Sequence, residues 1–239
     1  MKKKFKIAIS IFLNSNFKKI ERKIKKAKIL GADFVELRAD SFFQIKKEDL
    51  RKLRKILKKL KIPGIFTLRS KEEGGKFNFE KEKKLELIKE AINLGFEFVD
   101  VEMSFLEKIG KDVLSLKKKS KVKIILSYHN FKKPLTFREI EKIKRKMEKL
   151  KPDIYKIAVI SKGKFKKEPI LKLIEKAKKE KKKIIAIAMG EKAKFLRIKA
   201  MKMGNYLNYF SLDPKEKTAP GQVWIGDLDK VFFGGKIKL

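Results

Sequence analysis

Short apolar runs alternate along the chain with longer segments whose apolar residues recur at the spacing of an amphipathic helix. The apolar runs recur at intervals of roughly thirty residues, which is the length of one strand–helix unit. This pattern predicts strands at 5–13, 34–40, 64–70, 97–103, 122–130, 154–160, 184–190 and 206–212.

The intervening segments predict helices at 17–30, 47–60, 79–94, 137–150 and 169–179, with a weaker helical pattern at about 104–119. Thr136 precedes one of these helices and Glu139 follows three residues later, as in a capping box. Gly31, Gly95 and Gly204 stand where helices are expected to end. The chain therefore predicts a regular strand–helix alternation throughout.

Eight strand–helix repeats without a glycine-rich dinucleotide fingerprint predict an α/β fold, a closed (β/α)8 TIM barrel, as a single domain over residues 1–239. The alternative is a doubly wound open sheet, which would have fewer strands and a phosphate-binding loop. The near-continuous apolar runs suit strands that are buried on both faces.

Polar residues interrupt five adjacent predicted strands, and within each strand they keep one parity. They are Glu36, Arg38, Thr67, Arg69, Asp100, Glu102, Ser127, His129 and Lys156. Residues two apart share one face of a strand, so these side chains are expected to point into the barrel. One such pair could equally be a structural salt bridge. Charges inside five strands instead predict a catalytic centre at the carboxyl ends of the strands.

Lys156 lies in the apolar segment 153–159, whereas most lysines of the chain lie in runs of lysine. Burial would favour its neutral, nucleophilic amine. The alternative is an edge strand that leaves the ammonium group in solvent. His129 ends the preceding strand, close to Lys156. A nucleophilic lysine beside a general base suits imine chemistry at a carbonyl group.

The chain has 66 Lys and Arg against 29 Asp and Glu, a formal net charge of +37. Such a charge is typical either of a nucleic-acid-binding protein or of a biased, thermophilic proteome in which lysines lie on solvated helix faces. The lysines are spread along the chain and no recognition motif accompanies them, so we expect no nucleic-acid partner. The positive field would attract a small anionic substrate.

The chain has no cysteine and one histidine, which excludes disulfides, thiolate metal sites and multi-histidine metal sites. We expect neither metal nor cofactor. No apolar run is long enough to span a membrane. The first residues imitate a signal peptide, but the apolar part is short and no small-residue cleavage site follows, so we expect a cytoplasmic protein.

Several segments, in this order, match one family. They are Glu36–Asp40, Phe66–Ser70 with Glu73–Gly75, Ser127–Phe131, Tyr155–Ala158, Ala188–Gly190 through Arg197, and Ala219–Gln222. On these residues the chain resembles type I 3-dehydroquinate dehydratases, the Schiff-base-forming hydro-lyases of the shikimate pathway. The match to the eighth strand is loose.

The resemblance implies dehydration of 3-dehydroquinate to 3-dehydroshikimate by syn elimination. It implies Lys156 as the Schiff-base lysine, His129 as general acid and base, and Glu73 as the carboxylate that orients His129. The implied substrate-binding residues are Glu36, Arg38, Arg69, Arg197, Thr218 and Gln222. Thr218 replaces the family's serine but keeps the hydroxyl. A homodimer is expected from the family.

Two alternatives use the same residues differently. A lysine-dependent aldolase would share Lys156, but its substrates are often phosphorylated, and Gly190 followed by Glu191 and Lys192 makes a poor phosphate-binding loop. A basic nucleic-acid-binding protein would not need Lys156. The sequence does not decide which of Asp100 and Glu102 joins the catalytic network.

Overall fold

The computed structural model describes residues 5–118, 120–161 and 168–232. The strands are β1 (Ile7–Phe12), β2 (Phe34–Arg38), β3 (Gly64–Thr67), β4 (Phe98–Glu102), β5 (Lys123–Asn130), β6 (Ile154–Ile160), β7 (Ile184–Met189), β8 (Asn208–Ser211) and β9 (Val223–Trp224). The helices are α1 (Phe17–Ile29), α2 (Lys47–Lys59), α3 (Lys81–Asn93), α4 (Met103–Lys118), α5 (Phe137–Lys149), α6 (Pro169–Lys179), α7 (Lys194–Lys202) and α8 (Ile225–Phe232).

Every predicted strand and helix is present, within a few residues of its predicted bounds. The weak segment at 104–119 forms α4. The short strand β9 and the helix α8 that follows it were not predicted. The predicted single domain of 1–239 extends beyond the described residues and stays a prediction.

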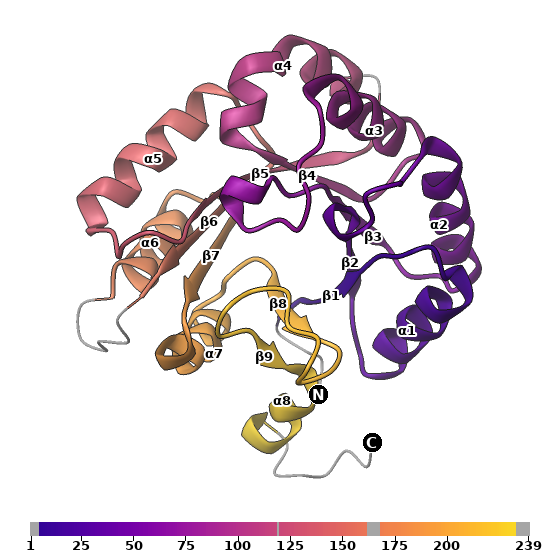
Figure 1. Ribbon diagram of the computed structural model, residues 1–239. Helices are drawn as coiled ribbons and strands as arrows, with labels where there is room; N and C mark the ends of the chain where they lie inside the picture. Colours follow the sequence, from indigo (N-terminus) through magenta and orange to yellow (C-terminus); the bar gives the residue numbers. More distant parts are fainter. Residues whose placement is uncertain (1–4, 119, 162–167, 233–239) are drawn as a thin grey trace.

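All the strands are parallel and form one nine-stranded sheet in the order β7-β6-β5-β4-β3-β2-β1-β8-β9. The sheet curls round on itself, and the helices surround it on the outside (Figure 1). This arrangement confirms the predicted α/β barrel class and excludes the doubly wound open sheet, which would have helices on two faces.

The edge strands of the sheet are β7 and β9, and the segment that leads into β8 reaches β7. No strand ladder joins β7 and β8 in the described part of the chain. The backbone N–H of Tyr206 donates to Ile184 O at 2.9 Å, and the backbone N–H of Ala186 donates to Asn205 Oδ1 at 2.8 Å. The side chain of Asn205 therefore replaces one of the backbone acceptors that a strand ladder would supply. We call this junction of β7 with the start of β8 the β7–β8 seam.

The inside of the barrel is layered. An apolar layer near the amino ends of the strands contains Ala8, Ile65, Phe98, Ile125, Ile154, Ile185, Leu207 and Tyr209. Two residues further along the same strands, the inward positions become polar, as in the steps from Phe98 to Asp100 and from Ile154 to Lys156. Consequently the half of the barrel near the amino ends of the strands is a packed apolar core, and the polar groups lie at the carboxyl ends.

The outer helices end in a repeated way. Gly31, Gly95 and Gly204 have positive φ angles of 82°, 71° and 100°, as expected for residues that follow a helix. Lysine takes the same left-handed conformation after α2, α5 and α6, with φ of 49° at Lys61, 46° at Lys151 and 53° at Lys181. The predicted capping box of Thr136 and Glu139 is present at the start of α5.

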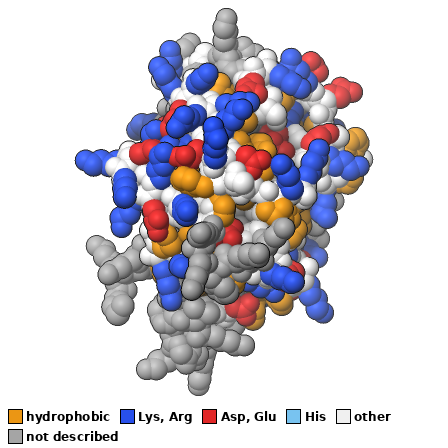
Figure 2. Space-filling view, turned by 90° about the vertical axis from the view of Figure 1, so that its left-hand side faces the viewer, with side chains coloured by type: hydrophobic (Ala, Val, Ile, Leu, Met, Phe, Trp, Pro, Cys, Tyr) orange, Lys and Arg blue, Asp and Glu red, His pale blue; other side chains and the backbone are white. Residues whose placement is uncertain are grey.

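Lysine and arginine side chains are spread over the face shown in Figure 2, with aspartate and glutamate among them. The interpretation of helix lysines as solvated is wrong for Lys84 and Lys144, which are 5% and 3% exposed. Lys144 Nζ lies 2.8 Å from Glu148 and 2.5 Å from Glu180, where α5 meets α6. Within the described ranges, no helix has the length and apolar character needed to span a membrane.

Candidate active site

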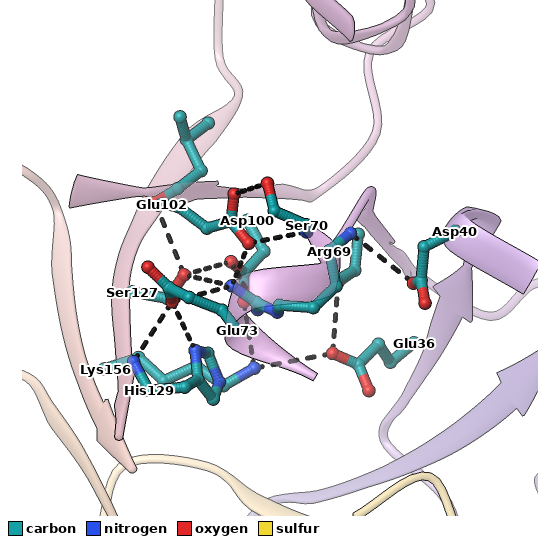
Figure 3. Close-up of polar contacts among 12 residues, drawn as sticks. Glu36, Asp40, Arg69, Ser70, Glu73, Asp100, Glu102, Ser127, His129 and Lys156 are labelled. Atoms are coloured by element: carbon teal, nitrogen blue, oxygen red, sulfur yellow. Dashed lines mark hydrogen bonds and ion pairs between the residues drawn. The ribbon is translucent and has the colours of Figure 1, made fainter. Parts of the chain in front are cut away.

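A cavity lies at the carboxyl ends of the strands. All of the predicted site residues line it, namely Glu36, Arg38, Arg69, Glu73, His129, Lys156, Arg197, Thr218 and Gln222. They come from different strands and from the loops that follow them, and Figure 3 shows the polar contacts among those nearest to Lys156. The position matches the end of a barrel that carries active sites.

Lys156 projects from β6, which is flanked on both sides by β5 and β7, so the edge-strand alternative is wrong. The residue is 3% exposed. Its Nζ lies 2.9 Å from Asp100 Oδ2 and 3.4 Å from Glu36 Oε1. On a further side, Nζ lies 4.2 Å from the ring centroid of Tyr209. These neighbours surround the amine and hold it at the cavity.

His129 is held by a single carboxylate oxygen. Oε2 of Glu73 accepts the backbone N–H of His129 at 3.0 Å and lies 2.9 Å from its Nδ1 (Figure 3). When Glu73 is ionised, Nδ1–H donates to it and the lone pair of Nε2 is left free. Ser127 pairs with Lys156 in the β5–β6 register, so His129 stands two residues further toward the cavity on the same face.

The loop that carries Glu73 depends on two glycines. A Cβ on Gly75 would lie 2.0 Å from Arg69 O, which excludes any other residue there. Gly74 has a φ of +87°, and a Cβ there would meet the ring of Phe131 at 2.6 Å. The loop can therefore place the Glu73 carboxylate against His129 only if glycine occupies positions 74 and 75.

Burial shifts the pKa of both partners. It raises the pKa of Glu73 to about 7, against an opposing effect of the Arg69 charge. Burial, followed by the charges of Arg69 and Lys156, holds the pKa of His129 well below its ordinary value. At neutral pH the imidazole is therefore uncharged and able to accept a proton.

Arg69 is the central cation of the cluster. Its Nη1 donates to Ser127 Oγ at 2.7 Å and its Nη2 to Asp100 Oδ1 at 2.9 Å, while Glu102 Oε1 lies 3.4 Å from Nη1. Burial opposes its charge, but these carboxylates together raise its pKa. Burial likewise opposes ionisation of Asp100, but Arg69 and Lys156 hold its pKa well below the ordinary range. Of the two acids left open by the sequence, Asp100 contacts Lys156 directly.

Glu102 faces away from Lys156 and binds a different lysine. Its Oε2 accepts hydrogen bonds from Ser70 Oγ at 2.6 Å and from Lys84 Nζ at 2.5 Å. Its Oε1 accepts the backbone N–H of Ser70 at 2.7 Å. Lys84 belongs to α3, so this contact ties an outer helix to the loop that leads to Glu73. Glu102 therefore supports the site indirectly.

Glu36 and Arg38 occupy the same strand but have different partners. Glu36 accepts hydrogen bonds from Ser10 Oγ at 2.6 Å and Thr67 Oγ1 at 3.0 Å. Arg38 makes a bidentate pair with Asp40, with distances of 2.7 and 2.9 Å. Its remaining N–H groups reach Thr218 O at 3.2 Å and Gly74 O at 3.3 Å. Arg38 thus joins the loop after β3 to the loop before β9.

Arg197 lines the same cavity and is held by two backbone carbonyls. Arg197 donates from Nε to Ala188 O at 3.0 Å and from Nη2 to Pro220 O at 2.9 Å. Burial lowers its pKa to about 10, so the group stays positive at neutral pH. Among the described residues it forms no ion pair within 4.0 Å. It is therefore available for an anion in the cavity.

Gln222 holds the loop that passes over the cavity. Its Oε1 accepts the backbone N–H of Thr218 at 2.6 Å and the Thr218 hydroxyl at 3.1 Å, and its Nε2 donates to Ser10 Oγ at 3.3 Å. The hydroxyl of Thr218 thus makes a contact that a serine could also make. The side chain of Gln222 is only 1% exposed, so the 218–222 segment is closed down in this structure.

Further residues at or near the site were not predicted, namely Asp40, Ser70, Lys84 and Tyr209. Asp40 could have been found, because it lies two residues after Arg38. Lys84 lies four residues before Ile88 and seven before Ala91, on the apolar face of α3, and this spacing was obscured by the abundance of lysine. No group of three or more metal-ligating side chains occurs in the part of the chain that the structure describes.

Comparison with known proteins places these residues in a family context. Residues 7–236 match the family model described as type I 3-dehydroquinase. The 3-dehydroquinate dehydratase of Methanocaldococcus jannaschii is 36% identical over 217 residues, which cover 89% of this chain and 93% of that protein. That of Pyrococcus abyssi is 35% identical over 209 residues, covering 87% and 90%.

Solved structures agree with the fold. The 3-dehydroquinate dehydratase of Aquifex aeolicus superposes with a TM-score of 0.78 at 28% identity, covering 96% of this chain and 99% of that one. The type I enzyme of Clostridium difficile, solved with covalently modified comenic acid, gives 0.77 at 28% identity, covering 95% and 90%.

Proposed function

Because this chain belongs to the type I 3-dehydroquinase family, we propose that it dehydrates 3-dehydroquinate to 3-dehydroshikimate through an imine on Lys156. Dehydratase activity is the function of the family and of the relatives that match nearly the whole chain. The imine mechanism and the residue roles are inferred from the geometry of the cavity.

Lys156 acts as the nucleophile. Its neutral amine adds to the ketone carbon of the substrate, and the adduct loses the ketone oxygen as water to leave a positively charged imine. His129 moves the protons that this step requires, because its Nε2 is free and its Nδ1 is fixed by Glu73. Asp100 and Glu36 lie beside the charge that persists on Nζ.

His129 also drives the elimination. Its Nε2 takes a proton from the carbon next to the imine, and the electron pair of that C–H bond moves into the ring as an enamine. The enamine expels the hydroxyl group of the following carbon, which leaves as water with the proton returned by His129. Addition of water to the conjugated imine then releases 3-dehydroshikimate and Lys156, so one water is lost overall.

The remaining groups bind the ring. Arg197 lines the cavity with its guanidinium unpaired by any described carboxylate, which suits the carboxylate of the substrate. Glu36, Arg38 and Arg69 also line the cavity, and Thr218 and Gln222 lie on the segment that covers it. Arg69 is so fully engaged by Ser127 and Asp100 that we assign it mainly to electrostatic support.

A single observation carries this proposal: one buried lysine opens into a cavity that also holds a base with a fixed tautomer. The direct test is reduction with borohydride in the presence of 3-dehydroquinate, followed by peptide mass spectrometry. We expect a reduced substrate adduct on the peptide that contains Lys156. Absence of that adduct from an enzyme that still forms the conjugated enone product, followed by ultraviolet absorbance, would rule out the imine.

The His129→Ala variant separates the two roles of the histidine. Removing a general acid–base typically costs about 10²- to 10⁴-fold in rate, so turnover should fall by that amount. Imine formation should be slower but still detectable by borohydride trapping, because Lys156 is intact. Unchanged turnover in this variant would contradict the role of His129.

We also propose a cytoplasmic homodimer, on the basis of the family and of the sequence features given above. Multi-angle light scattering coupled to size-exclusion chromatography measures the oligomeric state directly. A mass of a single chain, at concentrations that support full turnover, would contradict the dimer.

A further inference from the structure

Tyr209 is a residue of the site to which the proposed function gives no role. It lies on β8, is 7% exposed, and lines the active-site cavity. Its ring centroid lies 4.2 Å from Nζ of Lys156, which is within the range of a cation–π contact. Its hydroxyl group is buried without a hydrogen-bond partner among the described residues. The ring is therefore in contact with the reacting nitrogen, and the hydroxyl makes no hydrogen bond to a described residue.

The phenol stays neutral. Burial, together with the charges of Glu36 and Asp100, raises the pKa of Tyr209 well above its ordinary value. Its interaction with Lys156 is consequently that of a neutral aromatic face with a cation, and it is not an ion pair. Such an interaction is strongest where water is excluded, and Lys156 is 3% exposed.

The ring differs from the other neighbours of Nζ in what it requires. An ammonium group has three N–H donors, whereas a protonated imine has one. Asp100 and Glu36 both accept hydrogen bonds from Lys156 in the resting protein, and the imine nitrogen cannot keep both of them. The aromatic face attracts the positive charge whichever hydrogens remain, so its contribution survives the change from ammonium to imine.

We propose that Tyr209 is a positioning residue for the imine chemistry, whose ring holds the positively charged Nζ of Lys156 toward the cavity before and after the bond to the substrate forms. This proposal rests on the proposed function. It assigns the work to the aromatic ring, with the hydroxyl group as a bystander.

The test compares Tyr209→Leu, which removes the ring, with Tyr209→Phe, which removes the hydroxyl alone. Without the ring, Nζ is no longer held toward the cavity, and this misplacement should lower turnover of the Leu variant by about 5- to 30-fold. The Phe variant should retain at least about 3-fold more turnover than the Leu variant, because it keeps the ring. Tyr209→Met provides a second ring-free variant with a flexible apolar side chain, should the Leu variant fold poorly.

A second measurement distinguishes positioning from simple loss of packing. The pH midpoint of borohydride trapping should move lower by roughly 0.5 to 1.5 units in the Leu and Met variants, because no aromatic face attracts a positive charge at this position. Their turnover falls while trapping at low pH improves. A packing defect would lower both together.

Tyr206 offers a matched control outside the cavity. Its ring lies 4.7 Å from Nζ of Lys6 and 5.7 Å from Nζ of Lys183. Tyr206→Leu should leave the pH midpoint of trapping where it is. Equal losses in the Leu and Phe variants of Tyr209, or lower turnover with an unmoved midpoint, would overturn the proposal. Absence of any trapped adduct in the unaltered protein would instead overturn the proposed function.

Discussion

Lysine is buried in two regions of this protein, inside the barrel and in the helical coat around it. Lys156 inside and Lys144 in the coat are each 3% exposed, and each has a carboxylate oxygen within 2.9 Å. The partners differ. The side chains of Asp100 and Glu36 are 0% and 4% exposed beside Lys156, whereas those of Glu148 and Glu180 are 28% and 29% exposed beside Lys144.

This difference shows that burial and ion pairing alone do not mark a nucleophile. Lys144 has both, but it seals the junction of two helices and its partners remain in contact with water. Lys156 has both as well, and it opens into a cavity with a free base. Lys84 is an intermediate case, because it belongs to the outer helix α3 and its Nζ donates to Glu102 of β4. The surroundings of each ammonium group decide its role.

The sharpest contrast comes from matched substitutions to methionine. Lys156→Met removes the nucleophile and should lower turnover by at least about 10⁴-fold with the fold retained. Lys144→Met should leave turnover within about twofold and change the free energy of unfolding by at most about 1 kcal/mol, since its partners stay hydrated. Steady-state kinetics and denaturant unfolding measure both. Comparable turnover in the two variants would erase the distinction.

Lys84→Met tests the intermediate case. Removing one partner of a buried ion pair leaves Glu102 with a poorly compensated charge, which typically costs about 3–5 kcal/mol of stability. We expect the loss to exceed that of Lys144→Met, and turnover to fall less than with Lys156→Met. Urea unfolding with both variants side by side is the measurement. A smaller loss than with Lys144→Met would place Lys84 with the solvated coat.

Carboxylates inside the site and in the outer helices differ as well, because their pKa values are shifted in opposite directions. Inside the site, burial raises the pKa of Glu73 to about 7. Turnover should fall as pH drops through about 7, because the protonated carboxyl no longer accepts the Nδ1–H of His129. Orienting residues of this kind are typically worth about 10- to 100-fold, so Glu73→Gln should lose that much at pH 8. A pH profile of turnover for both proteins tests it.

Glu73 and Glu139 should make the stability of the protein depend on pH in opposite directions. The pKa of Glu73 is raised, so its stabilising contribution is present below pH 4.5 and is lost as pH rises through about 7. The free energy of unfolding of Glu73→Gln, taken relative to that of the unaltered protein, should therefore be higher at pH 8 than at pH 5. At the start of α5, the backbone N–H of Thr136 lowers the pKa of Glu139 to about 2. The free energy of unfolding of Glu139→Gln, taken relative to that of the unaltered protein, should be lower at pH 8 than at pH 3.

The smallest effect belongs to the coat. Lys61, Lys151 and Lys181 hold left-handed backbone conformations that glycine adopts at the ends of α1, α3 and α7. Replacing any of them by glycine should leave turnover unchanged and stabilise the protein by at most about 1 kcal/mol. Thermal unfolding of the three single variants measures this. Destabilisation in all three would show that the lysine side chains contribute more than the strain costs.

Much of this fold could be predicted from the sequence, because parallel strands buried on both faces leave long apolar runs and the helices carry clear caps. The inward polar residues were predictable because Glu36, Arg38 and His129 keep strand parity. Their roles were obtained from the resemblance to a family, and the cavity brings them together.

What was not predictable depends on contacts between distant segments. Strand β9 is two residues long, and it exists only because β8 lies beside it. The contact of Tyr209 with Lys156 joins strands that are not neighbours in the sheet, and neither parity nor periodicity encodes it. The choice of Asp100 over Glu102 as partner of Lys156 was open for the same reason.

The β7–β8 seam gives Arg197 two duties. Its guanidinium donates to Ala188 O on the free edge of β7 and to Pro220 O in the segment over the cavity. A bound carboxylate would compete for these same donors, and part of its binding free energy would be offset by the bonds it displaces. Closure of the barrel and capture of the ligand are therefore thermodynamically linked through one side chain.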